Sequence, residues 1–496
     1  MDLAKRFVET ATKNANKEAV FWGDTTLLYQ HFVQESAAVA QALIERFQIS
    51  PGTRVALWLK NCPEFISATY GVLRAGGVIV PINNFLKASE VAYILEDANA
   101  QVLITDDELA TKLDEIADSV PDLAVLKTSE FTELDAVDEN PEEFAAKRKA
   151  EDLAVIIYTS GTTGRPKGAM LTHGNLLHNV ESCQHELETI ELDRMAILLP
   201  MFHSFMLTVG IFLPLSTGCS LVLIRSLHPP KNILMEIIRH QATILPAIPQ
   251  LFRTLSTIDL PPLPLRLCIS GAAPLPVEVL KQFTERVGIP LIEGYGLSEA
   301  SPVVSLNPIR GERKPGSIGR PIKNVEVAIL DEQGKALANH EIGEVCVRGG
   351  NVMQGYWNRP DETSLTLVDG WLRTGDIGYQ DNDGYFYITD RKKDMLLVNG
   401  INVYPREIEE RLYEINGIKE AAVVGKHHPK RGEQPVAFVS LDEGVNLDTG
   451  TIQAQLKTQL ADFKIPREVH ILDALPRNAT GKILKTELRK QLESDS

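Results

Sequence analysis

One stretch constrains this chain more than any other: Tyr158–His173, which reads YTSGTTGRPKGAMLTH. The residues just before it, Ala154–Ile157, are apolar and mostly β-branched, a composition typical of a buried strand. Gly161 and Gly164 let the backbone that follows adopt φ > 0 and approach a ligand closely. The sequence therefore predicts a buried strand that leads directly into a ligand-binding loop.

The loop also carries the side chains that an anion requires. Backbone N–H groups in such a loop form a concave anion site, which hydroxyl and ammonium groups can complete. A polyphosphate is therefore the expected ligand, and a plain polar turn is the alternative for a cluster of Ser, Thr and Gly. The spacing does not fit a Walker A loop, because no Gly-Lys-Ser/Thr follows Gly161 at the required distance. The candidate ligands are Thr159, Ser160, Thr162, Thr163 and Lys167.

Composition narrows the class of protein. The chain has 496 residues, of which 44% are hydrophobic, which suffices for a sizeable core and for roughly two to four domains. The formal net charge of -16 and the pI of about 5.3 exclude a nucleic-acid partner, because no basic field is present to release counterions. A local cluster such as Arg391-Lys392-Lys393 can still hold one phosphorylated ligand.

The cysteines and the apolar segments indicate a cytoplasmic location. The five cysteines are scattered and lack metal or CxxC spacing, as expected for reduced thiols in the cytosol. The N-terminus lacks the apolar core of a signal peptide. The uncharged segment Met206–Ile224 mimics a membrane span, but Gly210, Pro214 and Gly218 interrupt it, so we expect a buried helix, a turn and a strand. Peripheral membrane contact and a homodimer stay open.

Helical and strand patterns alternate through the first 150 residues, as in a parallel α/β sheet. Further along, Lys323–Arg348 alternates apolar and polar residues, which predicts a small antiparallel barrel. The segment from residue 391 to the end predicts a compact α+β unit. The expected helices are Gln34–Phe47 and Pro63–Ala75, and the expected strands include Arg54–Leu59, Val78–Ile82 and Leu267–Ser270.

The loop stretch resembles, nearly letter for letter, the phosphate-loop signature of the adenylate-forming superfamily, which includes acyl-CoA synthetases, carrier-protein-linked adenylation domains and luciferases. In that family the loop holds the phosphates of ATP. The resemblance covers nearly the whole chain and implies an α/β fold. The implied N-terminal domain, residues 1–389, contains two parallel-type αβ subdomains (1–150 and 151–320) and a small β-barrel (321–389). A hinge joins it to a small α+β lid (390–496).

The resemblance assigns an acid-binding site to the segment Met201–Phe205, which reads MFHSF. The matching histidine of acyl-CoA synthetases lies between the nucleotide and the acyl tunnel, so His203 is implied to be catalytic; by itself it would be a core residue. Amino-acid-activating relatives usually carry an aspartate near this place, so His203 favours an acid without an α-amino group. Phe205 and Met206 are implied to line the acyl pocket, and Met206 stands where many fatty-acid relatives carry Gly.

Three further segments match the family's nucleotide site: GAAP at Gly271–Pro274, EGYGLSEA at Glu293–Ala300, and the TGD turn with Asp376. Alone they would be an αβ connection, a surface charge and a turn. The resemblance implies that Asp376 binds both ribose hydroxyls and that Glu299, a catalytic residue, binds Mg²⁺ with Thr159, since this cation prefers oxygen ligands. The implied ATP contacts are Thr159, Ser160, Gly161, Thr162, Thr163, Gly164, Lys167, Gly271, Ala272, Glu293, Gly294, Tyr295, Gly296, Ser298, Asp376, Arg391 and Lys482.

The segment Asp390–Glu410 resembles the family's hinge motif, with Asp390 as the pivot; without the resemblance it would be a solvated charge run. Lys393 is implied to lie near the adenylate. Leu397 stands where aryl-acid-activating relatives often carry Lys, which disfavours aryl acids. The implied coenzyme A contacts are Lys393, Asn399 and Gly400.

Near the C-terminus, PRNATGKILK at Pro476–Lys485 matches the segment that presents the family's catalytic lysine, here Lys482. Outside this context an exposed lysine would simply be solvated. Lys482 and Gly400 do not obviously serve both steps of a reaction in one arrangement, which fits a lid that swings between two poses.

The implied reaction needs ATP, Mg²⁺ and coenzyme A. A carboxylate attacks the α-phosphate of ATP, pyrophosphate leaves, and the thiol of coenzyme A then takes the acyl group and releases AMP. Fixed positive charge offsets the repulsion between the anions. The leading interpretation is a ligase for medium or long fatty acids. The alternatives are an acyl-[acyl-carrier-protein] synthetase, an aryl-CoA ligase and an inactive nucleotide-binding scaffold, the last disfavoured by the presence of Lys167, Glu299, Asp376 and Lys482.

Overall fold

The strand predicted ahead of the loop lies in a seven-stranded sheet of the computed structural model, which describes residues 2–134, 147–159, 165–227, 229–428, 432–478 and 481–494. The sheet has the order β18 (Gly355–Tyr356), β8 (Lys167–Thr172), β7 (Leu153–Thr159), β4 (Val78–Pro81), β3 (Arg54–Trp58), β5 (Ala100–Thr105) and β6 (Ala124–Lys127). The strands from β7 to β6 are parallel, whereas β8 and β18 are antiparallel to their neighbours. The loop therefore joins the two arms of a hairpin, β7 and β8.

A second, nine-stranded sheet packs beside the first. Its order is β15 (Arg320–Pro321), β14 (Val303–Leu306), β13 (Leu291–Gly296), β12 (Leu267–Ser270), β11 (Ile244–Ala247), β9 (Arg194–Ile197), β10 (Ser220–Leu223), β1 (Glu18–Trp22) and β2 (Thr25–Leu28). It is parallel from β13 to β1. The sheets do not follow the predicted boundary at residue 150, because β1 and β2 join the second sheet while β7 and β8 join the first.

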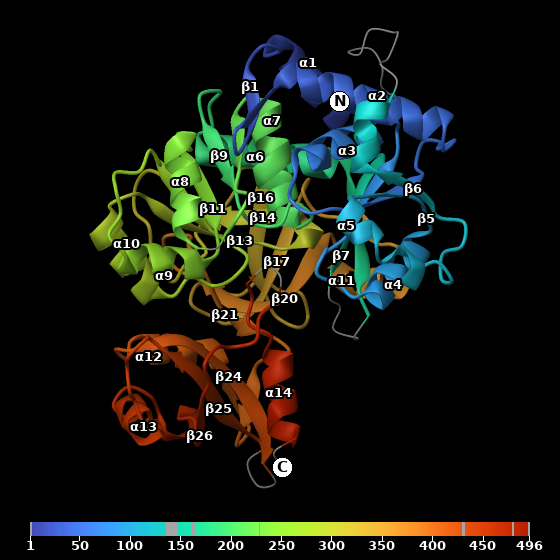
Figure 1. Cartoon of the computed structure of the whole chain (residues 1–496). Helices are drawn as coiled ribbons and strands as arrows, with labels where there is room; N and C mark the ends of the chain where they lie inside the picture. Colours follow the sequence, from blue (N-terminus) through green and yellow to red (C-terminus); the bar gives the residue numbers. More distant parts are fainter. Residues whose placement is uncertain are drawn as a thin grey trace.

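Helices cover these two sheets (Figure 1). The predicted helix Gln34–Phe47 begins earlier, at Tyr29, because Tyr29 and Phe32 are fully buried and extend its apolar face. The uncharged segment Met206–Ile224 forms the buried helix, turn and strand that its composition predicts, and its helix opens as a π-helix, η3 (Met206–Phe212). The α-helices here are α1 (Leu3–Lys13), α2 (Tyr29–Glu45), α3 (Pro63–Arg74), α4 (Ala88–Ala98), α5 (Asp107–Ala110), α6 (His173–Leu187), α7 (Leu213–Thr217), α8 (Lys231–Arg239), α9 (Pro249–Thr257) and α10 (Val277–Val287).

The region predicted as a small barrel is an antiparallel sheet of five strands. It contains β16 (Val325–Leu330), β17 (Gly343–Gly349), β20 (Trp371–Gln380), β19 (Leu367–Val368) and β21 (Phe386–Arg391), and α11 (Pro360–Thr366) lies between β18 and β19 in the chain. β20 is long enough to pair with β19 at one end and with β21 at the other. Among the described strands these pairs form an open sheet rather than a closed ring.

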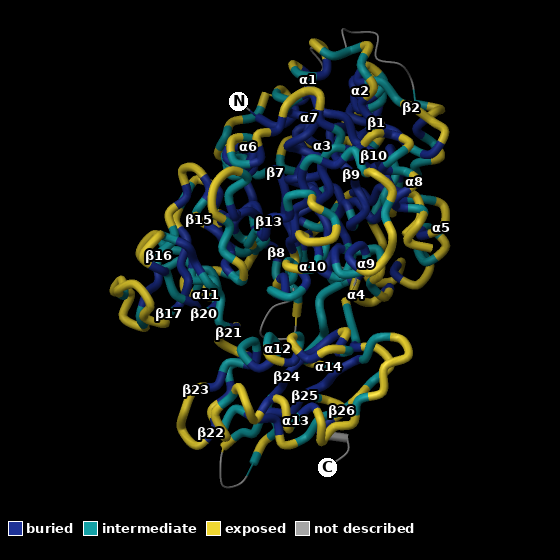
Figure 2. The backbone as a smooth tube through the Cα atoms, turned by 90° about the vertical axis from the view of Figure 1, so that its left-hand side faces the viewer, coloured by how far each residue is buried: buried dark blue, intermediate teal, exposed yellow. Residues whose placement is uncertain are grey.

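The remaining elements form a separate unit, here called the C-terminal module (residues 396–494), below the body (residues 2–391) in Figure 1. Its sheet has the order β23 (Ile401–Val403), β22 (Leu396–Val398), β25 (Gly432–Leu441) and β24 (Ile418–His428), with β26 (Glu468–Ile471) on β25. The helices are α12 (Pro405–Tyr413), α13 (Thr449–Lys457) and α14 (Lys485–Ser494). Two apolar clusters of its own lie on the two faces of β24 and β25, so the module has its own core (Figure 2).

Within the described ranges, no helix combines the length and the apolar character that a membrane span requires.

Candidate functional site

A cavity of about 1520 Å³ lies where the body meets the C-terminal module, and both contribute to its wall. Its main contributors follow the carboxyl ends of β7, β9, β12 and β13, the edge at which open α/β sheets bind ligands. The predicted site residues that line it are Thr159, Lys167, His203, Phe205, Gly271, Ala272, Gly294, Tyr295, Gly296, Ser298, Glu299, Asp376, Arg391, Lys393 and Lys482. Five predicted loop residues, Ser160, Gly161, Thr162, Thr163 and Gly164, lie outside the described residues.

The two arms of the loop hairpin meet a carboxylate. Thr159 ends β7 and pairs with Lys167, the first residue of β8. The hydroxyl of Thr159 donates to Glu299 Oε1 over 3.4 Å, and the hydroxyl of Tyr356 donates to the same oxygen over 2.8 Å. Lys167 Nζ lies 5.3 Å from the centre of the Tyr356 ring. An ammonium group, a hydroxyl and a carboxylate therefore share one wall of the cavity.

A second carboxylate, Asp376, lies in the TGD turn of β20 and is only 6% exposed. The Tyr295 hydroxyl donates to Asp376 Oδ2 over 2.5 Å, and Arg391 Nε lies 3.4 Å from Oδ1. The turn is held from behind, because the Gly375 N–H donates to Glu344 Oε1 over 3.0 Å. The side chain of Asp376 is thus fixed by groups from two other strands, as a specific ligand contact requires.

Glycine and alanine residues form the part of the cavity wall between these two carboxylates. A Cβ on Gly271 would lie 3.0 Å from the Phe205 ring, and a Cβ on Gly296 would lie 2.3 Å from the carbonyl oxygen of Pro302. Because Cβ atoms do not approach backbone that closely, Gly296 admits no other residue. Ala272 adopts the left-handed region with φ 65°, which turns the chain sharply after β12. These residues keep this part of the wall free of bulky side chains, and its contact with a flat ring stays a prediction.

Two nitrogen bases at the cavity, Lys482 and His203, both have lowered pKa values. Burial, with the nearby charge of Arg391, lowers the pKa of Lys482 to about 8. Burial, with the positive charge of Lys482, lowers the pKa of His203 to about 4. His203 Nδ1 accepts a hydrogen bond of 3.3 Å from the Phe205 N–H, so the proton of the neutral ring is on Nε2. At neutral pH the site therefore combines a charged lysine with an uncharged histidine that can donate.

Glu293 belongs to the EGYGLSEA segment but does not line the cavity. Its side chain is buried, its Oε1 accepts from the Leu275 N–H over 3.0 Å, and Arg406 of the C-terminal module approaches to 4.0 Å. Burial raises its pKa to about 7, and Arg406 opposes this shift. We therefore assign Glu293 to the boundary between body and module rather than to a direct ATP contact.

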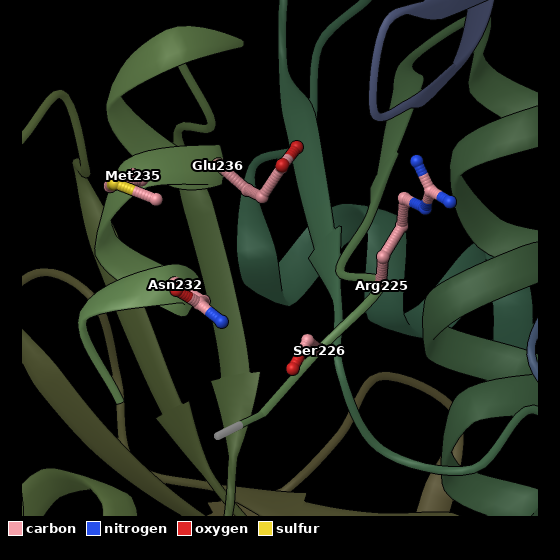
Figure 3. Close-up of a pocket in the computed structure, with 5 residues that line it drawn as sticks. All are labelled: Arg225, Ser226, Asn232, Met235 and Glu236. Carbon is pink, nitrogen blue, oxygen red and sulfur yellow. The ribbon is translucent and has the colours of Figure 1, made fainter. Parts of the chain in front are cut away.

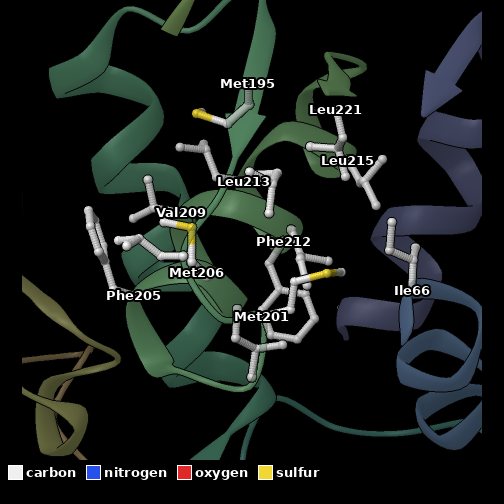
Figure 4. Packing of buried hydrophobic residues seen from close by; sticks show 14 of the residues in the cluster. Ile66, Met195, Met201, Phe205, Met206, Val209, Phe212, Leu213, Leu215 and Leu221 are labelled. Atoms are coloured by element: carbon white, nitrogen blue, oxygen red, sulfur yellow. The ribbon is translucent and has the colours of Figure 1, made fainter. Parts of the chain in front are cut away.

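Met206 also differs from its prediction. It is fully buried on η3 and does not line the cavity, whereas its neighbour Phe205 does (Figure 4). The Met206 sulfur is so close to Gly210 that a Cβ there would lie 3.1 Å from it. Met206 therefore fills the space behind the wall that Phe205 forms.

Of the predicted coenzyme A contacts, Lys393 lines the cavity and two others do not. Asn399 and Gly400 form the turn between β22 and β23, with φ of 52° and 78°, and both are exposed. No heavy atom lies within 4 Å of a Cβ built on Gly400. In this arrangement the module presents Lys482 to the cavity and keeps the Gly400 turn away from it.

Sequence reasoning missed several residues that line or support the site. Tyr356 binds Glu299, and Arg373 Nη1 lies 3.2 Å from Glu344, the carboxylate that holds the TGD turn. The Asn478 side chain accepts from the Lys482 N–H over 2.9 Å and so fixes the turn that carries the lysine. These are common residue types without a distinctive local pattern. Arg373 directly precedes the TGD turn, and Asn478 lies in the segment Pro476–Lys485 that was expected to present Lys482, but the sequence assigned no contact to either side chain.

A second cavity, of about 430 Å³, lies beside α8 (Figure 3). It is lined by Arg225, Ser226, Asn232, Met235 and Glu236, none of which the sequence predicted. Their side chains do not converge on a common point in Figure 3, so we assign no role to this cavity.

The fold and the main cavity define a class: adenylate-forming enzymes, which combine a large α/β N-terminal domain with a smaller C-terminal domain. The chain belongs to the AMP-binding enzyme family, whose model matches residues 7–357, and the model of the AMP-binding enzyme C-terminal domain matches residues 407–482. As a member it is an AMP-forming acid–thiol ligase that uses ATP.

Full-length relatives agree with this assignment. The chain is 37% identical to a long-chain-fatty-acid–CoA ligase of Bacillus subtilis (strain 168), with 97% of this chain and 93% of that protein covered. It is 35% identical to a feruloyl-CoA synthase of Amycolatopsis sp, with 98% of each covered. The crystal structure of ATP-bound MatB from Rhodopseudomonas palustris matches with a TM-score of 0.91 and 31% identity, over 100% of both chains.

Proposed function

We propose that this chain is a fatty acyl-CoA ligase. It activates a fatty acid as acyl-AMP with release of pyrophosphate and then transfers the acyl group to coenzyme A with release of AMP. The observation that carries the proposal is a single cavity in which Lys482 of the C-terminal module joins Thr159, His203 and Glu299 of the body. The identity of 37% with a long-chain-fatty-acid–CoA ligase supports a fatty acid as the substrate.

The first half-reaction brings two anions together, a carboxylate and the α-phosphate of ATP. Catalysis then depends on fixed positive charge and on donors directed at the developing charge. Lys482 supplies a charge below pH about 8, and Arg391 and Lys167 add two more on the same cavity. Neutral His203 offers its Nε2–H to an oxygen of the acid. None of these residues needs to form a covalent intermediate.

Thr159 and Glu299 fit a Mg²⁺ ion. This cation takes oxygen ligands, binds through one or two protein groups, and completes its shell with water and substrate phosphates. A hydroxyl and a carboxylate 3.4 Å apart meet that demand. The described residues hold no cluster of three His, Cys, Asp or Glu that would form an all-protein cage. Bound there, the ion would neutralise charge on the phosphates and on the leaving pyrophosphate.

The second half-reaction requires another arrangement of the module. The predicted domain boundary at residues 389 and 390 falls within β21, the last strand of the body, and we place the pivot there, at Asp390. Its carboxylate accepts from the N–H groups of Arg391 (2.7 Å) and Arg406 (2.9 Å). Rotation about this point would withdraw Lys482 and bring the Gly400 turn to the cavity, where the pantetheine arm of coenzyme A would pass.

Aryl acids are a second candidate class. The feruloyl-CoA synthase relative is 35% identical to this chain, and Met206 fills the space behind the lining residue Phe205, where a smaller residue would leave more room. The two candidates differ in the length that the acid site must hold. If Met206 sets that length, Met206→Gly will extend the range of fatty acids accepted, and an unchanged chain-length profile would remove this role.

One assay tests the proposal: acid-dependent AMP formation over a panel of fatty and aryl acids, with and without coenzyme A. Formation of acyl-CoA from fatty acids is the expected result, and a preference for aryl acids would favour the second candidate. Transfer of the acyl group to a carrier protein and not to coenzyme A would identify the carrier protein as the acceptor. No AMP with any acid would overturn the proposal in favour of a nucleotide-binding scaffold.

A further inference from the structure

One carboxylate outside every predicted motif contacts two segments that bear on the site. Asp97 lies near the end of α4, and its side chain is only 11% exposed. Its Oδ2 accepts from the Tyr158 hydroxyl over 2.6 Å, and its Oδ1 accepts from Arg359 Nη2 over 2.7 Å. Its backbone carbonyl accepts from Trp357 Nε1 over 3.1 Å. The last turn of α4 therefore holds two segments that are far apart in the chain.

The first of these segments is the loop hairpin. Tyr158 immediately precedes Thr159, so the bond to Asp97 fixes the end of β7. One turn earlier on α4, the Tyr93 hydroxyl donates to the Pro166 carbonyl over 3.2 Å, and Arg165 lies 5.6 Å above its ring. α4 thus holds both ends of the loop, at Tyr158 and at Pro166.

The second segment leads to Glu299. Tyr356, whose hydroxyl donates to Glu299, is followed directly by Trp357, which bonds to the Asp97 carbonyl. The Trp357 N–H donates to the Gly168 carbonyl over 2.8 Å, and Tyr356 pairs with Ala169 of β8. The segment from Tyr356 to Arg359 therefore joins Glu299 to the same point on α4 that holds Tyr158.

We propose that Asp97 is a positioning residue: by holding Tyr158 and Arg359 together it sets the separation between Thr159 and Glu299, the two oxygen ligands assigned to Mg²⁺. The inference rests on the proposed function only for the identity of that ion. Asp97 does not line the cavity and acts through its two partners. Because Mg²⁺ demands near-ideal geometry, a small shift of either ligand lowers the affinity for Mg²⁺ more than the affinity for the nucleotide.

The test compares Asp97→Asn with the wild type in the full-length protein. The amide has the shape of the carboxylate but cannot accept both bonds, since its NH₂ group faces one of the two donors. Calorimetry measures the affinity for a non-hydrolysable ATP analogue with and without Mg²⁺. We expect the gain in affinity due to Mg²⁺ to fall by about tenfold, in line with a misplaced ligand, while the affinity without Mg²⁺ changes by less than about twofold.

A matched control separates positioning from general loss of stability. Asp193 is also buried and also joins distant segments, with Arg266 at 2.7 Å and Thr243 at 2.8 Å, but it lies outside the cavity lining. Asp193→Asn should lower the melting temperature without changing the Mg²⁺ dependence. Tyr158→Phe, which removes a single hydroxyl, should lose part of the Mg²⁺ gain and serves as the test if Asp97→Asn does not fold.

Half-reactions provide a second readout. Asp97→Asn should slow acyl-AMP formation and raise the Mg²⁺ concentration for half-maximal rate, yet leave thioester formation from supplied acyl-AMP unchanged. An unchanged Mg²⁺ dependence, or equal loss in both half-reactions with a melting-temperature drop like that of Asp193→Asn, would overturn the inference. If the wild type activates no acid at all, the proposed function fails, and the calorimetric comparison still decides the role of Asp97.

Discussion

Two turns of the C-terminal module have similar backbones and opposite surroundings. Gly481, in the turn that carries Lys482, has φ 79°, and a Cβ there would lie 2.4 Å from Ile248 of the body. Gly400, in the turn between β22 and β23, has φ 78° and no heavy atom within 4 Å of its Cβ position. The first turn is docked on the body, whereas the Cβ position of the second faces open space. Under the proposed function, this is the arrangement that the first half-reaction would need, with Lys482 at the cavity and the Gly400 turn away from it.

The comparison makes the two half-reactions separable by mutation. If each turn serves one step, a change in the docked turn should affect acyl-AMP formation, and a change in the Gly400 turn should affect thioester formation. Each step can be measured alone, by pyrophosphate exchange and by transfer from supplied acyl-AMP.

The largest effect is expected for Lys482→Ala. Loss of a fixed charge at the transition state should slow acyl-AMP formation by at least about 10²-fold and leave transfer from supplied acyl-AMP largely intact. Lys457→Ala, at an exposed position on α13 of the same module, is the control and should change neither rate. Equal losses in both steps would contradict the role assigned to Lys482.

The Gly400 turn should give the converse result. Gly400→Leu is expected to slow thioester formation by at least about tenfold, because a side chain would obstruct the path of the pantetheine arm, while acyl-AMP formation stays within about twofold. Gly444→Leu is the matched control, since Gly444 also has φ 78° and an open Cβ position in the same module. If both variants slow transfer equally, backbone strain and not the coenzyme explains the loss.

The pH dependence of acyl-AMP formation tests the role of the docked turn, which carries Lys482. The pKa of Lys482 is lowered to about 8 by burial, so its charge is present below that pH and is lost as the pH rises through it. The value of kcat/KM for ATP in acyl-AMP formation should therefore fall by about tenfold per unit above pH 8, because it reports the free enzyme. Lys482→Arg should remove this fall, and its persistence in that variant would assign it to another group.

The smallest effect is expected at the contact that docks the module. Arg253 of α9 lies 2.9 Å from Asp442 and 3.1 Å from the Ile418 carbonyl, both in the module. Arg253→Ala should slow acyl-AMP formation by about threefold, as for a partly exposed ion pair, and should not slow transfer. The reversed pair, Arg253→Asp with Asp442→Arg, should restore much of the rate. If the reversed pair does not restore the rate of acyl-AMP formation, the ion pair does not determine how the module docks on the body.

Several residues that the sequence proposed for the site do line the cavity, and they stand in short segments rich in Gly, Pro, Ser and Thr; their ligand contacts stay predictions. Lys167, Asp376 and Lys482 each follow a Gly or Pro directly, Thr159 and Gly271 lie within three residues of one, and all five line the cavity. Their neighbours in the chain thus carry enough information to locate them. The elements were predictable for the same reason, since strands such as β3 (RVALW) and β12 (LCIS) are apolar apart from one end residue.

Other residues were not predictable because their role depends on distant partners. Asp97 and Arg359 are separated by 262 positions, and nothing in α4 distinguishes Asp97 from other helical acids. Glu293 belongs to a matching segment, yet the side chain points to Leu275 and Arg406 instead of the cavity. Met206 lies in an uncharged stretch where every face of the helix is apolar, so the sequence does not show which side meets the ligand.

Gly481 has one more consequence. Any β-carbon there would have to displace Ile248 and hold a left-handed backbone, which costs about 1 kcal/mol or more for ordinary residues. A single added methyl group, as in Gly481→Ala, would weaken the packing of the Lys482 turn against Ile248. It would leave the Gly400 turn, which we assign to thioester formation, unchanged. The variant would then use supplied acyl-AMP faster than it forms acyl-AMP from acid and ATP. The first half-reaction therefore depends on Gly481 having no side chain.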